Sequence, residues 1–524
     1  MTATRSKKDF LVEGLEEVEP AYKEFAGKMF AGLLPSNNHD RVGEMMFWLF
    51  EPDEQLVPGS MIIWLNGGPG CSSFNCGVLM EHSPVTQPLH AAGYCCLQPS
   101  PKLSVNPHAW TRATTVLYIE QPIGTGFSYG YPLPQDEQDV SKDIYAFLQN
   151  FFKVFDHLKS YNFFVMGESY AGMFVPSIAR YIHLQNLKAE ENGNSIIPIK
   201  GAAIGNGWID AKVQGPAVID YSWWHGLIDQ PTRDALHNAW KNCMDSGQPL
   251  SPPFHPFNVQ DDCGMMWGVL QAAGQPNAYD ITTWDPNVDQ ITFSSEVFYN
   301  SPAVKKALHA PTNITWHGCR DGGGRRLKAI DNHRRLYMDN DLPLSVAPYI
   351  ADLLDADIPV LVYNGDRDMT TNMVGSELVL NAMEWSGKED WLDAKRGLWM
   401  VESSVQAGWA KEHGNLAFVV VYNSGHMVPY NQPIPAFDLL SRFLQKKSFL
   451  DLEMPTIRID HTKGKQTDSP SFTASIMTMP HGHISVGSDW ETLGSVGTIS
   501  FLIGVACCWL FMNQYSRRGY QQVL

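Results

Sequence analysis

The stretch Tyr161–Gly172, which reads Y-N-F-F-V-M-G-E-S-Y-A-G, decides the fold. Its apolar run from Phe163 to Met166 has the length and composition of a buried strand, and the residues after Ser169 have helical spacing. A strand that stops at Gly-x-Ser-x-small and turns directly into a helix predicts a nucleophile elbow, because small residues let the turn tighten and leave the hydroxyl clear. Ala171 replaces the usual second glycine, so an ordinary strand-to-helix turn stays an alternative.

Length, charge and cysteine content bound what the protein can be. Its 524 residues suffice for one large α/β domain with appendages, or for two to three smaller domains. A net charge of −17 argues against nucleic acid as the main partner. The nine cysteines include no Cys-x-x-Cys pair, and the His-Gly-His at His481–His483 lies in a polar tail. We therefore expect neither a metal site nor a cofactor.

Apolar runs with the length of strands recur along the chain, and segments of helical spacing lie between them. This alternation predicts an α/β fold with a central, mostly parallel sheet flanked by helices. Between about residues 210 and 300 the pattern loosens, which indicates a cap inserted over the active site. The expected strands are residues 41–50, 61–65, 116–120, 163–166, 199–204, 357–363 and 416–422, and the expected helices are 139–159 and 437–445.

Three polar residues each lie just past the carboxyl end of an expected strand, namely Ser169, Asp368 and His426. In open parallel sheets, ligands bind at this edge. Serine, acid and histidine in this order are typical of the α/β-hydrolase fold, which we therefore predict. Taken singly, Asp368 could be a turn former and His426 a loop histidine, and Asp366 competes for the role of the acid.

A glycine-rich loop, N-G-G-P-G-C-S-S at residues 66–73, directly follows the expected strand 61–65. Because glycine has no side chain to keep a ligand away, such a loop brings backbone N–H groups close to it. A simple β-turn is the alternative, but it would not require a run of glycine and proline residues as long as this one. The loop is therefore a candidate part of the site.

Seven segments resemble the serine carboxypeptidases, a family that includes carboxypeptidase Y and cathepsin A. They occur in family order from roughly residue 20 to residue 445, and so cover nearly the whole globular part. The segments are W-L-N-G-G-P-G-C-S-S (64–73), N-P-H-A-W (106–110), E-Q-P-I-G-T-G-F-S-Y (120–129), G-E-S-Y-A-G (167–172), I-G-N-G (204–207), Y-N-G-D-R-D-M (363–369) and G-H-M-V-P (425–429).

The resemblance implies an exopeptidase that removes one residue at a time from the C-terminus of a peptide. It makes Ser169 the nucleophile, His426 the general base and then acid, and Asp368 the residue that orients the imidazole. The chemistry agrees, since a serine hydroxyl is a poor nucleophile until an imidazole takes its proton. The backbone N–H groups of Gly68 and Tyr170 are the expected oxyanion hole.

The family also implies a device that recognises the free carboxylate of the substrate. Two carboxyl groups held close cannot both ionise easily, so one stays protonated and donates a hydrogen bond, and activity should be best at acidic pH. The sequence departs from the family pattern in two places. One residue near Cys76 is inserted relative to the family spacing, and Thr371 stands where a cysteine is common. Glu81 could also be a solvated loop charge. The expected carboxylate-binding residues are Asn66, Gly67, Glu81 and Glu168.

Cysteine pairs and a glycosylation sequon at Asn313 indicate an oxidising compartment. An extra bridge from Cys76 to Cys95 or Cys96 would suit the insertion. The pairs that the resemblance implies are Cys71 with Cys319 and Cys243 with Cys263.

The C-terminal part predicts a membrane anchor. Residues 9–450 form the expected catalytic domain and residues 451–491 a polar stem. Residues 492–516 carry no charge and are long enough to span a bilayer. The two arginines that follow place the tail, residues 517–524, in the cytosol. A stem and single span also resemble the fungal pheromone-processing carboxypeptidases.

This architecture predicts a single-pass protein of secretory-pathway membranes with a lumenal catalytic domain, in the Golgi, in the vacuole or lysosome, or at the cell surface. No signal peptide is visible near Met1, and we expect the true start to lie upstream.

Two alternative functions stay open at this point. The first is an acyltransferase that keeps the three catalytic residues, as in plant relatives, and the second is a non-enzymatic, protective binding partner. Retention of Asn66, Glu81 and Glu168 together favours peptides. The expected partners are the C-termini of peptides or proteins and, through one span, a membrane; the sequence indicates neither the oligomeric state nor the preferred C-terminal residue.

Overall fold

The computed structural model describes residues 5–15, 27–86, 104–192, 196–245, 264–283, 295–319, 341, 344–401 and 405–453. All of them belong to one compact unit, residues 1–456. No helix among these residues has the length and apolar character needed to cross a bilayer. The predicted span 492–516 lies outside the described residues, as do the tail 517–524 and most of the stem 451–491.

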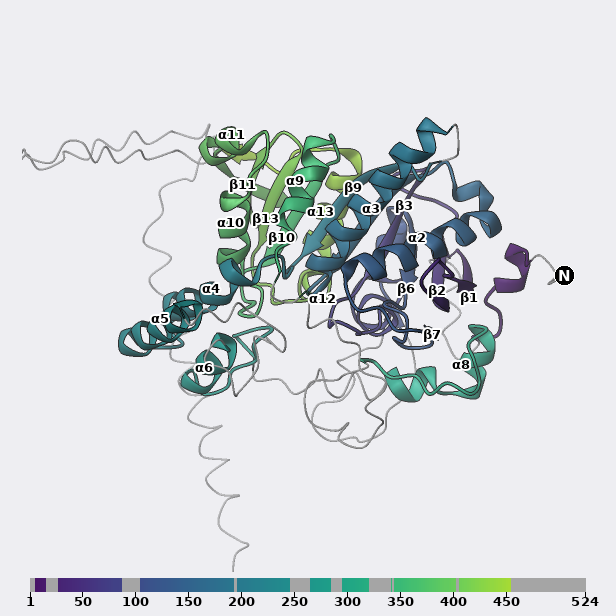
Figure 1. Ribbon diagram of the computed structural model, residues 1–524, viewed down its shortest axis with the longest axis horizontal. Helices are drawn as coiled ribbons and strands as arrows, with labels where there is room; N and C mark the ends of the chain where they lie inside the picture. The colour runs from purple at the N-terminus through teal and green to yellow at the C-terminus, as the bar shows by residue number, and fades with distance from the viewer. Residues whose placement is uncertain are drawn as a thin grey trace, which may run out of the picture. The chain divides into compact units, whose positions relative to one another are not determined.

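A large mixed sheet forms the centre of this unit (Figure 1). Within the described residues its strands follow the order β1-β2-β6-β3-β8-β9-β10-β13-β12-β11-β14, and β7 pairs with β2. The six strands from β6 to β13 are parallel, which confirms the expected sheet, whereas the strands on both flanks are antiparallel. The strands are β1 (Lys28–Pro35), β2 (Val42–Glu51), β3 (Ser60–Leu65), β6 (Thr115–Ile119), β7 (Tyr129–Tyr131), β8 (Asn162–Glu168), β9 (Ile199–Gly205), β10 (Val360–Gly365), β11 (Arg396–Val401), β12 (Val405–His413), β13 (Leu416–Val421) and β14 (Leu452–Glu453), with β4 (Val85–Thr86) and β5 (Ser104–Val105) forming a separate pair.

Side chains of the central strands alternate between two cores, one on each face of the sheet. In β3, Ile63 faces the core covered by α2, α3 and α9, whereas Trp64 faces the core covered by α13 and the π-helix η2. Because both faces are covered, the central strands consist almost entirely of apolar residues. The helices are η1 (Lys7–Phe10), η2 (Phe74–His82), η3 (Trp110–Arg112), α2 (Glu137–Val154), η4 (Asp156–Leu158), α3 (Ala171–Glu191), α8 (Pro302–Ala307), α9 (Ala347–Asp355), α10 (Met373–Ala382), α11 (Lys388–Asp393), α12 (Val428–Asn431) and α13 (Pro433–Gln445).

The region expected to form a cap contains α4 (Ala211–Trp224), α5 (Gln230–Asp245) and α6 (Met265–Ala272). The three helices lie together at one end of the sheet in Figure 1. They share a small core of their own, which also takes in Met369 from the loop after β10. This core therefore joins the region to the main sheet.

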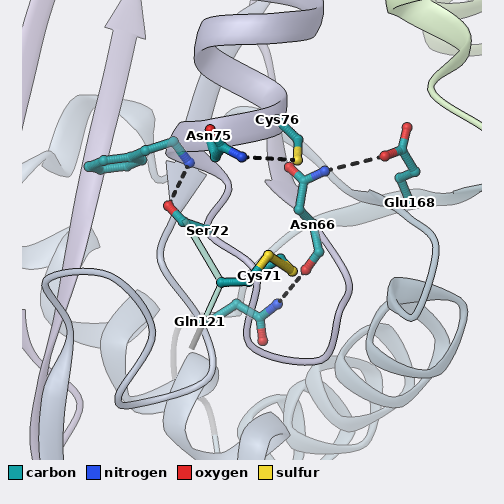
Figure 2. Close-up of a disulfide and its surroundings, with 9 residues drawn as sticks. Asn66, Cys71, Ser72, Asn75, Cys76, Gln121 and Glu168 are labelled. Carbon is teal, nitrogen blue, oxygen red and sulfur yellow. Dashed lines mark hydrogen bonds between the residues drawn. A yellow bond between two sulfur atoms is a disulfide. The ribbon is translucent and has the colours of Figure 1, made fainter. Parts of the chain in front are cut away.

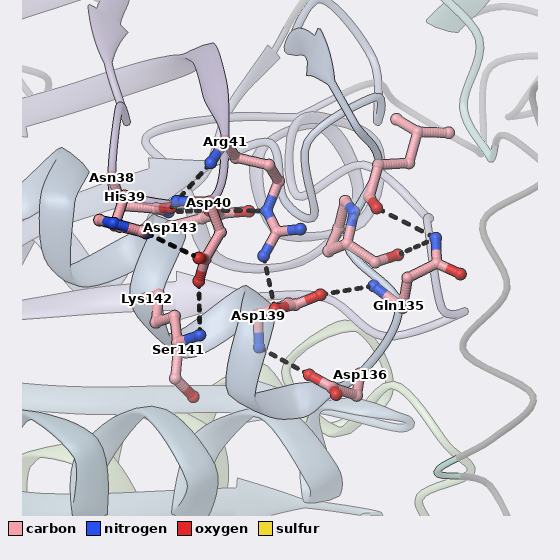
Figure 3. A network of polar contacts seen from close by, with 12 residues as sticks. Asn38, His39, Asp40, Arg41, Gln135, Asp136, Asp139, Ser141, Lys142 and Asp143 are labelled. Atoms are coloured by element: carbon pink, nitrogen blue, oxygen red, sulfur yellow. Dashed lines mark hydrogen bonds and ion pairs between the residues drawn. The ribbon is translucent and has the colours of Figure 1, made fainter.

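A buried arginine fixes α2 to the edge of the sheet (Figure 3). The Arg41 guanidinium lies 2.6 Å from an oxygen of Asp139 and 3.0 Å from one of Asp143. Asn38 donates a further hydrogen bond to Asp143. Because a buried charge is stable only when it is paired and hydrogen-bonded, these contacts hold the first turns of α2 in one position.

The strand register brings the candidate residues to one edge of the sheet. Leu65 pairs with Gly167, Glu168 with Gly205, and Gly365 with Val421, so the carboxyl ends of five parallel strands are level. The loop at residues 66–73 and the three predicted catalytic residues all follow these ends.

Candidate active site

The predicted strand–turn–helix at Ser169 is present. Strand β8 ends at Glu168, helix α3 begins at Ala171, and Ser169 between them has φ of 67°. Residues other than glycine rarely adopt this left-handed backbone conformation. Here it turns the Ser169 side chain out of the strand. The Ser169 N–H donates to the carbonyl of Gly205 (3.0 Å), which ties the turn to β9.

Packing explains why alanine can replace the second glycine of the elbow. Ala171 is fully buried, and a Cβ on Gly167 would come within 2.7 Å of its methyl group and 2.4 Å of the Leu65 carbonyl. The turn can therefore tighten because Gly167 has no side chain between Ala171 and the Leu65 carbonyl. The absence of a side chain at Gly67 also leaves room for the turn, since a Cβ there would lie 2.3 Å from the Tyr170 nitrogen.

The acid and the base lie in contact. Nδ1 of His426 is 2.7 Å from Oδ2 of Asp368, and both side chains are buried. Burial alone would raise the pKa of Asp368, but the adjacent His426 and hydrogen bonds from Thr370 and Asn206 lower it below its ordinary value. Asp368 is therefore held as a carboxylate that can orient the imidazole and stabilise its charged form.

Asp366, the competing acid, has a different task. Its carboxylate accepts the backbone N–H of Ser424 at 3.1 Å and so shapes the loop that leads to His426. Among the described residues, no hydrogen bond joins the Ser169 hydroxyl to His426. Such bonds are often long in ligand-free enzymes and shorten when substrate binds.

Residues after α6 hold the acid loop and the base loop together. Met369 donates its N–H to the carbonyl of Ala278 (3.0 Å), and His426 donates its N–H to the carbonyl of Tyr279 (2.8 Å). The Tyr279 ring also lies against the imidazole, with 4.9 Å between ring centroids. The region expected to form the cap thus contributes directly to the site.

The glycine-rich loop passes beside the elbow. Gly68 has φ of 113°, a conformation that favours glycine, and its N–H donates no hydrogen bond within the described residues. The contact between Gly67 and the Tyr170 nitrogen brings this loop against the first turn of α3. The two expected oxyanion donors therefore come from segments that touch.

The four residues expected to bind a carboxylate come together. The side-chain amide of Asn66 lies 3.4 Å from Glu81 and 3.4 Å from Glu168 (Figure 2 shows the second contact). Burial raises the pKa of Glu81 to about 7. Burial and then the neighbouring Glu81 raise the pKa of Glu168 well above its ordinary value. Within the part of the chain that the structure describes, Oε2 of Glu81 is buried without a hydrogen-bond partner.

The extra residue near Cys76 is accommodated by a π-helix. Helix η2 has this wider form over its whole length, so it takes in more residues per turn while Glu81 still reaches Asn66. The other side of Asn66 is fixed by Trp64 and by the N–H of Gly77, which donate to Oδ1 at 2.7 and 3.2 Å. The insertion therefore leaves the carboxyl pair intact.

The expected disulfide between Cys71 and Cys319 is present and joins segments 248 residues apart in sequence. Cys76 is a free thiol, so the suggestion of an extra bridge from it to Cys95 or Cys96 is wrong. Cys243 is disulfide-bonded, and its expected partner Cys263 lies outside the described residues, as do Cys95 and Cys96. The sequon residue Asn313 is exposed.

Sequence reasoning missed the residues that support the acid. Asp368 accepts hydrogen bonds from Asn206 (2.8 Å), from the Thr371 hydroxyl (2.9 Å), and from both the N–H and the hydroxyl of Thr370 (2.9 and 2.5 Å). Asn206 follows β9 directly, so its place at a central strand end was a usable signal. The two threonines carry no such signal, because only the loop conformation turns them toward Asp368.

The sheet, the elbow and the Asp368–His426 pair define a serine hydrolase with the α/β-hydrolase fold. Residues 20–446 match the family profile of the serine carboxypeptidases, and the chain belongs to this family. It is accordingly a hydrolase of the exopeptidase type, which acts on the C-terminal ends of peptides.

Known relatives agree with this assignment. The chain is 30% identical to serine carboxypeptidase S10 family member 2 of Dictyostelium discoideum, over 98% of this chain and 87% of the relative. It is 33% identical to serine carboxypeptidase-like 49 of Arabidopsis thaliana, over 78% and 75%. Among solved structures it resembles Kex1(delta)p, a prohormone-processing carboxypeptidase from Saccharomyces cerevisiae, with a TM-score of 0.70, 27% identity, and coverage of 84% of this chain and 97% of that one.

Proposed function

We propose that the protein cleaves the last peptide bond of its substrates through an acyl-enzyme formed on Ser169. His426 takes the proton of the serine hydroxyl and then gives it to the leaving amino acid, while Asp368 orients the imidazole. Water then attacks the ester, with His426 again acting as base. The Gly68 and Tyr170 N–H groups stabilise the oxyanion, and losing one such donor typically costs about 3–4 kcal/mol of transition-state stabilisation.

Restriction to the C-terminal residue comes from the carboxyl pair. The observation that carries this proposal is the contact of Asn66 with both Glu81 and Glu168, close to the elbow. Because the pKa values of both carboxyls are raised, at least one stays protonated at acidic pH and donates a hydrogen bond to the substrate carboxylate. As the pH rises, the pair ionises and repels that carboxylate, so substrate binding weakens.

The test uses peptides with blocked N-termini that end in Lys, Phe or Leu, incubated with the protein at about pH 5 and about pH 7.5. Mass spectrometry should show stepwise loss from the C-terminus, faster at the lower pH and absent in Ser169→Ala. The same peptides with an amidated C-terminus should be much poorer substrates. A folded protein that reacts with a fluorophosphonate but releases no amino acid would contradict the proposal and direct attention to acyl transfer to an alcohol.

We also propose that the catalytic unit lies in the lumen of the secretory pathway, anchored by residues 492–516. The Cys71–Cys319 disulfide and the exposed Asn313 are compatible with this, since both belong to an oxidising compartment. Endoglycosidase treatment of the full chain should lower its apparent mass, and the Asn313→Gln variant should not respond. Release of the chain from membranes by alkaline carbonate would contradict the anchor.

A further inference from the structure

Glu120 is a fully buried carboxyl that the mechanism above does not use. It follows the end of β6, and its side chain accepts three short hydrogen bonds. Oε1 accepts the Ser72 hydroxyl at 2.6 Å and the indole N–H of Trp316 at 2.5 Å, and Oε2 accepts the backbone N–H of Phe127 at 2.6 Å. All three partners are neutral donors. Burial raises the pKa of Glu120 to about 7, although these three bonds oppose the shift.

These contacts lie at both ends of the glycine-rich loop. Gln121, the next residue, donates its side-chain amide to the carbonyl of Asn66 at the start of the loop (3.3 Å). Glu120 holds Ser72 at the end of the loop. Figure 2 shows Asn66, Ser72 and Gln121 around Cys71. Two consecutive residues of one strand end thus support the segment that carries Gly68.

Trp316 connects the same carboxyl to the far side of the loop. Three residues after Trp316, Cys319 is bonded to Cys71, and the carbonyl of Gly318 accepts the N–H of Ser72 at 2.8 Å. Trp316 is fully buried. Glu120 is therefore the point at which the loop, the end of β6 and the disulfide-bonded segment meet.

We propose that Glu120 is a positioning residue of the oxyanion hole, which acts through Ser72 and Trp316 on the placement of the Gly68 N–H. The proposal rests on the proposed role of Gly68 as an oxyanion donor. A misplacement of about 1 Å in such a group can lower the rate about 100-fold, so a residue without contact to substrate can limit catalysis.

The donors around Glu120 require a carboxyl group. An amide of the same shape has one oxygen and one NH₂ group, and donors face both positions. With its oxygen toward Ser72 and Trp316, a glutamine would turn its NH₂ toward the Phe127 N–H. In the flipped orientation the NH₂ would face the Trp316 N–H. Either way two donors oppose each other and the loop must shift.

The experiment compares Glu120→Gln with Asp143→Asn as a control. Asp143 is another fully buried carboxyl, which lies in α2 and pairs with Arg41. For each variant we would measure thermal stability, the rate of fluorophosphonate labelling of Ser169, and kcat and KM on a peptide. We expect Glu120→Gln to label Ser169 and to turn over about 10- to 100-fold more slowly, with KM nearly unchanged. In Asp143→Asn, labelling and kcat should stay near wild type.

Two further variants keep the proposal falsifiable if Glu120→Gln does not fold. Ser72→Ala and Trp316→Phe each remove one donor to Glu120, and both should lower kcat and labelling without raising KM. Normal labelling in folded molecules of these variants would overturn the proposal, as would a loss of stability alone in Glu120→Gln. Labelling reports on Ser169 whatever the substrate is, so a failure of the carboxypeptidase proposal would be seen separately, as absent peptide release by the wild type.

Discussion

In the proposed mechanism, Glu81 is a residue whose proton bonds the substrate carboxylate. Burial raises the pKa of its carboxyl to about 7, so it loses its proton over a range in which ordinary glutamates are already ionised. The wild-type KM should therefore rise above about pH 7. A glutamine at this position would donate a hydrogen bond at every pH.

Glu81→Gln should separate the hydrogen bond from the proton. We expect its KM for a peptide with a free C-terminus to rise less steeply than that of the wild type between about pH 5 and about pH 8, because only Glu168 of the pair still titrates. Initial rates over this range, with an amidated peptide as the control substrate, would measure the effect. A KM that rises with pH as steeply as in the wild type would show that Glu81 does not carry the dependence.

Thr371 supports Asp368 with one hydroxyl, and valine has the same shape without it. Thr371→Val should lower the free energy of unfolding by about 1.5–3 kcal/mol at neutral pH, because a buried carboxylate loses a hydrogen bond. The turnover number should fall, while KM stays the same, since Thr371 supports the acid and makes no substrate contact in the proposed mechanism. Chemical denaturation and steady-state kinetics would check both.

At the scale of elements, the elbow depends on the close approach of β3 and β8. Gly167→Ala would place a methyl group 2.4 Å from the Leu65 carbonyl, which is backbone and cannot move without shifting β3. We expect a loss of about 1–3 kcal/mol of stability and slower labelling of Ser169.

Ala171→Gly is the matched control for the elbow, since it restores the usual glycine and only removes a buried methyl group. It should fold and label Ser169 at nearly the wild-type rate. If Gly167→Ala were as active as Ala171→Gly, the close approach of the two strands would not be what sets the turn.

The sequence predicted the central elements because they are apolar on both faces. It missed β1, β11 and β12, which are antiparallel and lie toward the flanks. A glycine interrupts each of the three, and polar residues further weaken the pattern of β12. In β12, a Cβ on Gly408 would lie 1.8 Å from the Val420 carbonyl, so this glycine is there for packing. Helix α2 begins at Glu137, two residues before the expected start, because the Asp136 side chain caps its first turn.

In the candidate site, the sequence placed the groups that follow strand ends and missed the residues that orient them. Ser169, Asp368 and His426 could be identified by order and position alone. Thr371 and Trp316 could not, because their contacts depend on loop conformation and on how distant segments pack.

At the scale of the whole molecule, buried acids make the fold sensitive to alkali. Burial raises the pKa values of Glu81 and Glu120 to about 7 and those of Asp143 and Asp341 to about 6. The folded state thus binds protons that the unfolded chain has already lost, so its stability is greatest in acid and falls as the pH rises toward these values. Asp368 has the opposite sign, because its lowered pKa adds stability that is lost only in stronger acid.

We therefore expect the unfolding temperature to be highest near about pH 4, to fall between about pH 4 and about pH 7, and to level off once these groups are ionised in both states. Circular dichroism or differential scanning fluorimetry across this range would measure it. The Asp143→Asn variant should show a weaker decline, since one of the titrating groups is gone. A melting temperature that rises from pH 5 to pH 8 would contradict this electrostatic account.

The Cys71–Cys319 disulfide has a consequence for how such an enzyme is made. A newly synthesised chain whose thiols are still reduced would contain every proposed catalytic side chain. Its Gly68 loop, however, would lack the covalent bond between Cys71 and Cys319. Oxidation would then serve as the activating event, and a nascent protease would be harmless to its neighbours until that bond closes. Mild reduction should accordingly abolish labelling of Ser169 at temperatures at which the fold is still intact, and reoxidation should restore it.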